Sequence, residues 1–307
     1  MKIVEFFKHF PDEVSCKAAF KANRDSEGVT CKKCNGTEHY WLSTRSQYKC
    51  KRCDFRTTLN SGTMLQHTKL TYSDWFLAMH LLTCTKKGFS TLELQKQLQT
   101  SRYQTVLYLV KKLRKAMGLR DSLYLLTGEV EVDEAMIEVA YPKGNDPGRG
   151  RGAHGKAKIL VMAATKYEPD SNMRIKKSCS YFKMKVIESF DYVELQSKVT
   201  QNVDESATVI TDGFASYKGL EAFFQEHIAI VCPPQEASKV LPWVHLVISN
   251  LKRKLLDIHH YISEKHLQLY LNEFCYKLNR RYFGINVFDR ILKACVAIKW
   301  NPWCMEE

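Results

Sequence analysis

Residues 128–139, GEVEVDEAMIEV, alternate apolar and acidic side chains around a central aspartate, Asp133. A period of two is typical of a half-buried strand, and it puts Glu131 and Asp133 on the face that need not be buried. A second short apolar stretch, 207–211, leads directly into Asp212. Carboxylates on strands hold Mg²⁺ against phosphate in many proteins. We therefore expect both aspartates in a magnesium site, the alternative being two ordinary surface aspartates.

The composition is that of a globular protein with an excess of positive charge. The 307 residues include 46 Lys and Arg against 33 Asp and Glu, which gives a formal net charge of +13. Such a charge favours a polyanionic partner, most commonly nucleic acid. The chain has no apolar run long enough for a membrane span, and its first ten residues do not resemble a signal peptide. We expect a cytoplasmic protein that associates with DNA and not with membranes.

Two Cys-x-x-Cys pairs lie near the N-terminus, with fifteen residues between them: Cys31 and Cys34, then Cys50 and Cys53. Two such pairs can bring four thiolates to one tetrahedral ion, and the intervening segment is long enough for a hairpin. The spacing therefore predicts a zinc ribbon with one structural Zn²⁺. A redox-active pair of cysteines is the alternative.

Residues 63–122 have the pattern of a helix-turn-helix. Ser90 with Glu93, and Ser101 with Gln104, each have the spacing of a capping box at the start of a helix. Basic residues on the second helix lie away from its apolar stripe, as phosphate contacts would require, although they could equally form a solvated face. The candidate DNA contacts on this helix are Arg102, Lys111, Lys112, Arg114 and Lys115.

The stretch 141–158 contains five glycines and five Lys or Arg. It lacks the residue order of a nucleotide-binding loop, so we interpret it as a clamp on the phosphate backbone or as a mobile connection. Its candidate DNA contacts are Arg149 and Arg151. The remaining chain alternates strand and helix patterns, which predicts a mixed α/β domain. The expected strands are 159–164, 176–190 and 227–231, and the expected helices are 192–203, 216–224 and 264–281.

A further helix is predicted from residue 242, and it carries His245 and Lys252 seven residues apart. Two helical turns place these side chains on nearly the same face, whereas Asn250 falls about 140° from His245. His245 and Lys252 can therefore face the two aspartates together. The alternative is that His245 is an ordinary core histidine.

Taken together, these motifs strongly resemble a prokaryotic insertion-sequence transposase of the family that couples an N-terminal zinc ribbon to an RNase H-like DDE domain. The resemblance is carried by the cysteine pairs, the helix-turn-helix, VDE at 132–134, TDG at 211–213 and WVHLVISNLKRKLL at 243–256. It implies an α/β fold class, with an RNase H-like mixed-sheet catalytic domain after the zinc ribbon and helix-turn-helix. The expected domains are 1–62 for the N-terminal helix and ribbon, 63–122 for the helix-turn-helix, and 123–300 for the catalytic domain.

The resemblance also implies an activity. Such an enzyme binds the terminal inverted repeats of its element and cuts and joins DNA strands with Mg²⁺ or Mn²⁺, as a dimer or a higher assembly on DNA. Asp133 and Asp212 match the first two catalytic carboxylates. The third is usually Glu with Lys seven residues later; here His245 precedes Lys252, with Asn250 as the fallback ligand. The alternatives are a catalytically inactive, domesticated relative that regulates by binding DNA, and a nuclease or resolvase on the same fold.

Overall fold

The chain forms two compact units in the computed structural model, Met1–Arg120 with Phe283–Glu307, and Asp121–Tyr282. We call them the first and second units. No helix among the described residues is long and apolar enough to span a membrane. The structure describes residues 2–85, 88–139, 156–169, 173–231, 233, 236–259 and 262–300.

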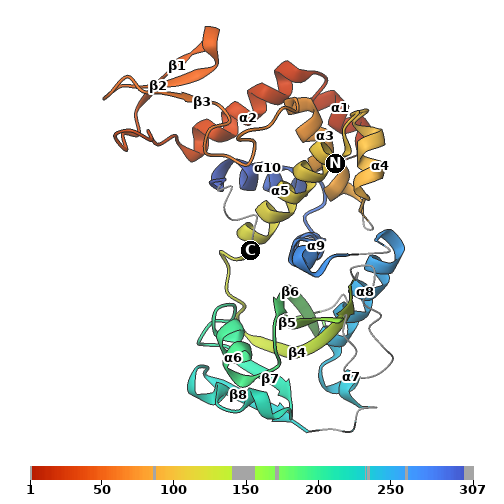
Figure 1. The fold of residues 1–307 in the computed structure, drawn as a ribbon. Coiled ribbons are helices and arrows are strands. Elements are labelled where there is room, and N and C mark those ends of the chain that lie inside the picture. The colour runs from red at the N-terminus through yellow and green to blue at the C-terminus, as the bar shows by residue number, and fades with distance from the viewer. Residues whose placement is uncertain are drawn as a thin grey trace. The chain divides into compact units, whose positions relative to one another are not determined.

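The first unit combines a small antiparallel sheet with helices, as Figure 1 shows. Asp12 and Thr71 begin two of the helices, because each side chain accepts a hydrogen bond from the backbone N–H three residues later. Trp75, Met79 and Leu82 of the helix that follows Thr71 are buried. The strands, in sheet order, are β1 (His39–Leu42), β2 (Gln47–Cys50) and β3 (Arg56–Thr58). The helices are α1 (Ile3–His9), α2 (Glu13–Glu27), α3 (Tyr72–Cys84), α4 (Thr91–Gln97), α5 (Tyr103–Asp121) and α10 (Val287–Ala297).

The helix-turn-helix region agrees with the sequence at one predicted cap and differs at the other. Ser90 and Glu93 form the predicted capping box of α4. Helix α5 begins only at Tyr103, so the prediction that Ser101 caps it is wrong. The preceding turn continues through this point, because the Gln95 side chain donates a hydrogen bond to the carbonyl of Thr100 (3.0 Å).

The last helix differs from the predicted domain boundary. Residues 283–300 were expected in the catalytic domain, but α10 belongs to the first unit. It packs against α2 and α3, where Phe288 meets Phe6 and Phe76 in edge-on ring contacts. The apolar face of α10 is therefore satisfied by helices from the opposite end of the sequence.

The second unit is built on a five-stranded mixed sheet in the order β6-β5-β4-β7-β8. Strands β4, β5 and β6 pair antiparallel, whereas β4, β7 and β8 pair parallel. This is the mixed α/β sheet predicted for an RNase H-like domain, and the fold class is confirmed. The strands are β4 (Glu129–Glu138), β5 (Lys156–Pro169), β6 (Ile175–Ile187), β7 (Thr208–Asp212) and β8 (Glu226–Ile230).

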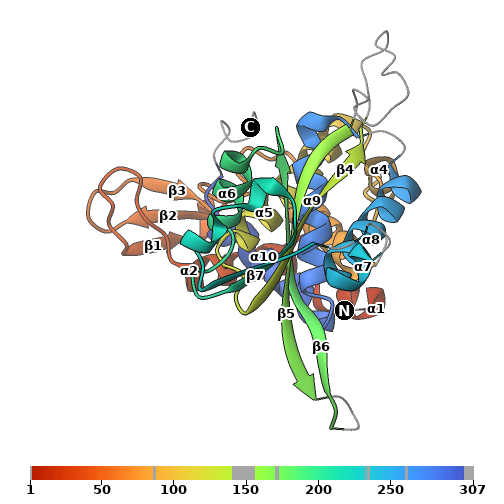
Figure 2. The same ribbon diagram turned by 90° about the horizontal axis from the view of Figure 1, so that it is seen from below.

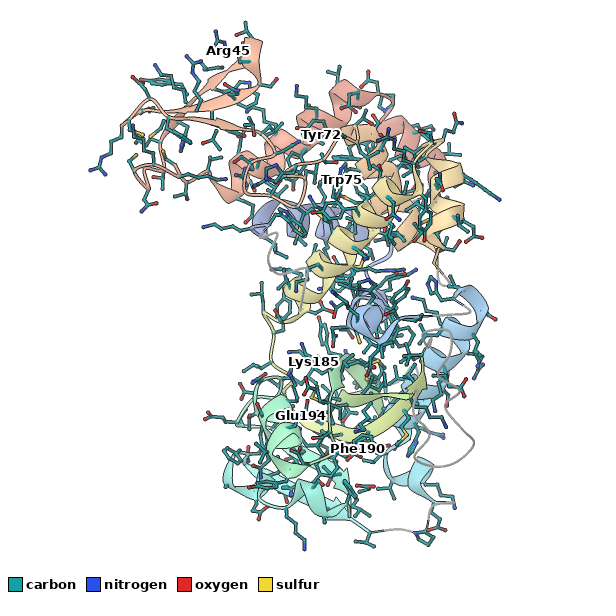
Figure 3. The ribbon with its side chains drawn as sticks, in the orientation of Figure 1. Arg45, Tyr72, Trp75, Lys185, Phe190 and Glu194 are labelled. Atoms are coloured by element: carbon teal, nitrogen blue, oxygen red, sulfur yellow. The ribbon has the colours of Figure 1, made fainter. Side chains whose placement is uncertain are left out.

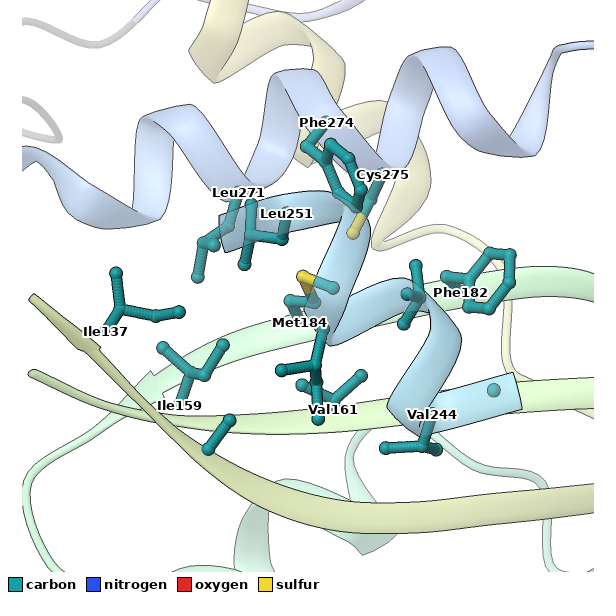
Figure 4. Packing of buried hydrophobic residues seen from close by; sticks show 14 of the residues in the cluster. Ile137, Ile159, Val161, Phe182, Met184, Val244, Leu251, Leu271, Phe274 and Cys275 are labelled. Carbon is teal, nitrogen blue, oxygen red and sulfur yellow. The ribbon is translucent and has the colours of Figure 1, made fainter. Parts of the chain in front are cut away.

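Helices cover both faces of this sheet. Helices α8 (Pro242–Ile258) and α9 (Glu264–Asn279) pack on one face, and α6 (Tyr192–Thr200) packs on the other. Figure 4 shows the first core, in which Val244 and Leu251 of α8 meet Ile159 and Val161 of β5. The face of β4 that carries Asp133 was expected to need no burial, but Glu131 and Ala135 on that face are buried, so this expectation is wrong. The short helix α7 (Ala237–Val240) precedes α8.

Two smaller features complete the second unit. The helix predicted at 216–224 is replaced by two 3₁₀ turns, Ala215–Tyr217 and Leu220–Ala222. Gly219 separates the turns with φ +93°, a left-handed conformation that a continuous helix cannot include. In Figure 2 the β5–β6 hairpin extends beyond the rest of the sheet. The β4–β5 pairing ends at Thr165, whereas β5 and β6 remain paired to Pro169.

Candidate active site and zinc ribbon

The four ribbon cysteines lie on two turns with the same backbone geometry. The N–H groups of Cys31 and Cys50 each donate to the carbonyl five residues later, both at 2.9 Å. Each turn includes one residue in the left-handed region, directly after the second cysteine of the pair. These residues are Asn35 (φ 56°) and Asp54 (φ 58°), and Asn and Asp are common in this conformation. The two turns therefore present their cysteines in equivalent ways.

The four sulfur atoms of this cluster lie within 4.8 Å of one another. Among the described residues this is the group of three or more His, Cys, Asp or Glu side chains that meets the geometry of a metal site. Gly36 permits the close approach, because a Cβ there would lie 3.3 Å from the Cys34 sulfur and 3.4 Å from the Cys50 sulfur. Four thiols in a closed cluster fit a structural Zn²⁺.

The Cys31 thiol is prepared for ionisation by its turn. Burial raises the pKa of Cys31. Hydrogen bonds from the backbone N–H groups of Lys33 and Cys34 and from the neighbouring thiols outweigh that effect and lower the pKa to about 7. The Lys33 N–H lies 3.4 Å from the Cys31 sulfur. A thiolate is the form that binds metal, so this local geometry favours binding.

The two predicted catalytic aspartates lie on neighbouring parallel strands. The recorded β4–β7 pairing ends with Glu131 opposite Ile210, and each aspartate stands two residues further along its strand. Asp133 is mostly buried, with 13% of its side chain exposed, and Asp212 is partly buried at the end of β7. Residues 79 positions apart in the chain (133 to 212) are thereby brought to the same edge of a strand pair.

Helix α8 brings His245 to Asp133. The His245 Nε2 lies 3.8 Å from an Asp133 carboxyl oxygen, and 33% of the histidine side chain is exposed. The buried side chains of Val244 and Leu251 fasten this helix to the sheet. Lys252 and Asn250 are both exposed on α8.

The carboxylates of this site affect one another. Burial raises the pKa of Asp133; His245 lowers it, and the negative charge of Asp212 raises it. Burial and then the charges of Asp133 and Asp212 raise the pKa of Glu134 to about 7. Three acidic groups therefore share a partly dry site, and a bound cation would offset the cost of ionising them.

Glu131 is a buried residue of this region for which the sequence analysis gave no role. Its side chain is 0% exposed, and one carboxyl oxygen accepts hydrogen bonds from the N–H groups of Trp243 (2.8 Å) and Val244 (3.2 Å). Helix α8 has no side-chain cap at its own N-cap residue. Glu131 thus satisfies the first turn of the helix that carries His245. The available signal was an acidic residue on the same strand face as Asp133.

Glu134 and Tyr217 were also missed. The Tyr217 hydroxyl and one Glu134 carboxyl oxygen are buried, and each group affects the pKa of the other. Burial, followed by the charges of Glu134 and the two aspartates, raises the pKa of Tyr217 well above its usual range. The only sequence signal for Glu134 was its position next to Asp133, and Tyr217 gave none.

The candidate DNA contacts on α5 divide into two groups. Arg102 is exposed, and Lys111 and Lys115 are half-buried. Lys112 and Arg114 are 0% and 1% exposed, so the prediction that they lie on an open face is wrong. Much of α5 packs into the core, which leaves its N-terminal turns as its most exposed part. Arg149 and Arg151 fall outside the described residues.

Comparison with known proteins identifies related families for both parts of the chain. The model of the ISXO2-like transposase domain matches residues 125–279, and that of the transposase zinc-ribbon domain matches residues 11–55. An uncharacterized protein in transposable element ISH50 of Halobacterium salinarum is 26% identical over 255 residues, which cover 77% of this chain and 79% of the relative.

Among solved structures, similar chains occur in complexes of Mos1 transposase. A pre-cleavage Mos1 transpososome is 14% identical, covering 76% of this chain and 79% of that chain, with a TM-score of 0.29. A Mos1 mariner paired-end complex with Mn is 15% identical, covering 72% and 78%, with a TM-score of 0.28.

Proposed function

Because the chain belongs to the ISXO2-like transposase family, we propose that it is an active DNA transposase. It binds the terminal inverted repeats of its element and catalyses metal-dependent strand cleavage and strand transfer. The observation that carries the proposal is the approach of His245 to within 3.8 Å of Asp133. The influence of Asp212 on the pKa of Asp133 also supports it. The short distance and this influence together require that β4, α8 and β7 meet at Asp133.

Asp133, Asp212 and His245 are the residues that would hold Mg²⁺ or Mn²⁺. Such ions, when bound, stabilise both the attacking and the leaving oxygen of an in-line displacement at phosphorus. The donor set fits a divalent cation, because two carboxylates and an imidazole combine negative charge with neutral coordination. The buried Glu134 carboxyl group belongs to the same site, where burial and the charges of the two aspartates raise its pKa.

The chain's own groups have distinct roles in this reaction. The two aspartates would hold the ions beside the reacting phosphate, and no covalent intermediate with the protein is required. Lys252 is exposed on the helix that carries His245, seven residues later. It would contact a phosphate beside the scissile bond as a point charge, and not as an acid or base.

The third ligand is His245 in this proposal and not Asn250. His245 is half-buried beside Asp133, whereas Asn250 is exposed and projects about 140° away around the helix. A histidine on this helix could have been an ordinary core residue, but its partial exposure and its carboxylate neighbour favour the role of a ligand.

The first unit supplies the remaining functions. Cys31, Cys34, Cys50 and Cys53 hold one structural Zn²⁺, and the N-terminal turns of α5 with Arg102, Lys111 and Lys115 contact DNA. Arg149 and Arg151 remain proposed contacts from the glycine-rich stretch. The protein acts on DNA in the cytoplasm as a homodimer or a higher assembly, since two ends of an element have to be held together.

The test is a strand-cleavage and strand-transfer assay on the element's own ends with Mg²⁺ or Mn²⁺. Wild-type protein is expected to cleave and join, and Asp133→Ala to lose at least about 10³-fold in cleavage rate, as for catalytic groups that act in concert. Asp133→Ala should retain end binding, because binding depends on phosphate contacts elsewhere. Binding without cleavage by the wild type in either metal would support the inactive, DNA-binding alternative instead.

A further inference from the structure

A pocket of about 410 Å³ lies beside the N-terminal turns of α5 in the first unit. The turn 67–70 forms one wall, the exposed start of α5 forms another, and Trp75 of α3, labelled in Figure 3, also lines it. This volume is within the range of sites that hold small organic ligands. The pocket shares no residue with the aspartate site or with the cysteine cluster, since all its lining residues lie between 67 and 112.

Lys112 is a buried cation that lines this pocket. Its side chain is 0% exposed, and its ammonium donates to the carbonyl of Gln66 at 2.5 Å. The rings of Trp300 and Tyr108 lie 4.4 Å and 5.0 Å from the ammonium nitrogen. Within the described part of the chain Lys112 forms no ion pair with a carboxylate.

Among the described residues, no negatively charged side chain compensates the charge of Lys112. Burial lowers the pKa of Lys112 to about 8. A buried ammonium without a counter-charge costs free energy, and an anion that enters the pocket would offset that cost. An anion is therefore the ligand that the floor of the pocket favours.

The rim of the pocket points to the same class of ligand. Lys69 and Arg102 line it and are exposed, and none of the described lining residues is acidic. The Tyr108 ring, 41% exposed, offers a flat surface at the same opening. Cations around an aromatic face are the arrangement that binds phosphate together with a base.

We propose that this pocket binds one nucleotide of the DNA substrate, with its phosphate between the exposed Lys69 and Arg102, over the buried charge of Lys112, and its sugar or base against Tyr108. The proposal rests on the DNA binding proposed above and assigns a defined part of it to this pocket. The nucleotide belongs either to an intact duplex or to an unpaired strand, and the chemistry of recognition is the same for both.

The test measures DNA affinity and protein stability for Lys112→Met, with Asp133→Ala present in every protein so that no DNA is cut. The probe is a fluorescent duplex of the element's terminal repeat. Lys112→Met is expected to bind about 10-fold more weakly. The slope of log affinity against log salt should fall by about 0.9, the value for one lost phosphate contact. Lys8→Met removes the same charge from an exposed position on α1 and should leave affinity and slope unchanged.

Thermal unfolding separates this role from a purely structural one. Without DNA, Lys112→Met should have the same midpoint as the Asp133→Ala parent or a higher one, because a buried charge has been removed. DNA should then stabilise it less than it stabilises the parent. A lower midpoint with unchanged DNA affinity would overturn the proposal and leave Lys112 a packing residue. Arg102→Gln, at an exposed site, should reproduce the loss of affinity without any change in the midpoint.

Two further arms identify the source of the nucleotide. The same duplex carrying an unpaired 3′ extension should bind more tightly than the blunt duplex if the pocket takes a single strand, and equally if it takes the duplex backbone. In both cases the difference between Lys112→Met and its parent has to persist. If the parent binds the ends and both pocket variants bind equally well, the pocket proposal fails while the transposase proposal stands. If the parent binds no DNA, both fail.

Discussion

The cysteine cluster and the aspartate site are assembled in opposite ways. The four cysteines lie within 23 residues (31 to 53), and each pair is shaped by a turn whose hydrogen bonds span no more than five residues. The groups of the aspartate site come from β4, β7 and α8, which span 113 residues (133 to 245). Its geometry depends on a complete sheet and on a helix packed across that sheet. The cysteine cluster is a local site, so its segment should need bound metal in order to fold. The aspartate site is distributed over the chain, so it should need the folded second unit in order to bind metal.

Removal of zinc should have the largest effect and should remain local. The ribbon has only three strands of three or four residues, so metal binding, worth about 10–16 kcal/mol in zinc-finger peptides, provides most of its stability. Chelation, or Cys50→Ser with Cys53→Ser, should unfold residues 29–58 and leave the amides of β4 and β5 protected. Hydrogen exchange measured alongside zinc content checks this. Less than one zinc per chain in native protein, or a ribbon still protected without metal, would exclude a structural zinc site.

Substitution of His245 should alter metal preference without unfolding the protein. His245→Ala should lose at least about 100-fold in cleavage, because a ligand matters more than an outer-shell partner. Wild type should prefer Mn²⁺, which accepts nitrogen ligands more readily than Mg²⁺, and His245→Glu should shift the preference towards Mg²⁺. Cleavage rates measured in each metal give the answer.

Asn250→Ala is the matched control for that experiment, since it changes an exposed polar residue of the same helix. It should cleave at nearly the wild-type rate. A dead Asn250→Ala beside an active His245→Ala would show that the other face of α8 carries the ligand.

Substitution of Glu131 tests whether the aspartate site depends on the hydrogen bonds between β4 and the first turn of α8. Glu131→Ala leaves the N–H groups of Trp243 and Val244 without their acceptor. The loss should cost about 1–3 kcal/mol of stability and reduce cleavage by about 10–100-fold, because small displacements of reacting groups are costly. Glu131→Gln keeps one acceptor oxygen and should recover most of the rate. The measurements are urea unfolding and single-turnover cleavage.

Glu129→Gln is the control for Glu131, because Glu129 lies on the same strand and contacts Lys177 and Tyr167 instead of α8. It should leave the cleavage rate almost unchanged. Equal losses for Glu129→Gln and Glu131→Ala would mean that charge on this strand matters and that the anchoring of α8 does not.

Glu134 should give the smallest effect, visible in the pH dependence of stability. Its pKa is raised to about 7, so between pH 4.5 and 7 the folded state holds more protons than the unfolded state. Stability from this group therefore falls as pH rises through that window. Without divalent ions, Glu134→Gln should stabilise the second unit by roughly 1–3 kcal/mol at pH 8 and hardly at all at pH 4.

Hydrogen exchange of β4 and β5 amides reports that stability for the second unit alone. Glu138→Gln changes an exposed glutamate on the same strand and should show no such pH dependence. Stabilisation of Glu134→Gln that is equal at pH 4 and pH 8 would contradict a buried, charge-coupled carboxyl group.

The features of this protein that depend on local geometry could be predicted from its amino-acid sequence. The Cys-x-x-Cys spacing predicted a cysteine cluster that the structure assembles. Period-two alternation located β4 and Asp133, and Ser90 with Glu93 located the start of α4. Helical periodicity put His245 on a usable face of α8, and the structure brings it to Asp133. The order of these motifs indicated both the family and the α/β fold class.

Which polar groups are buried, and what they contact, could not be predicted from the sequence because both depend on tertiary packing. The same spacing rules put Lys112 and Arg114 on an open face, yet both are buried. Glu131 has the sequence pattern of a surface residue, yet it satisfies the first turn of a helix more than a hundred residues away. Helix α10 packs with α2 and α3, which come from the opposite end of the sequence. Periodicity shows which side chains share a face, but what covers that face depends on elements distant in the chain.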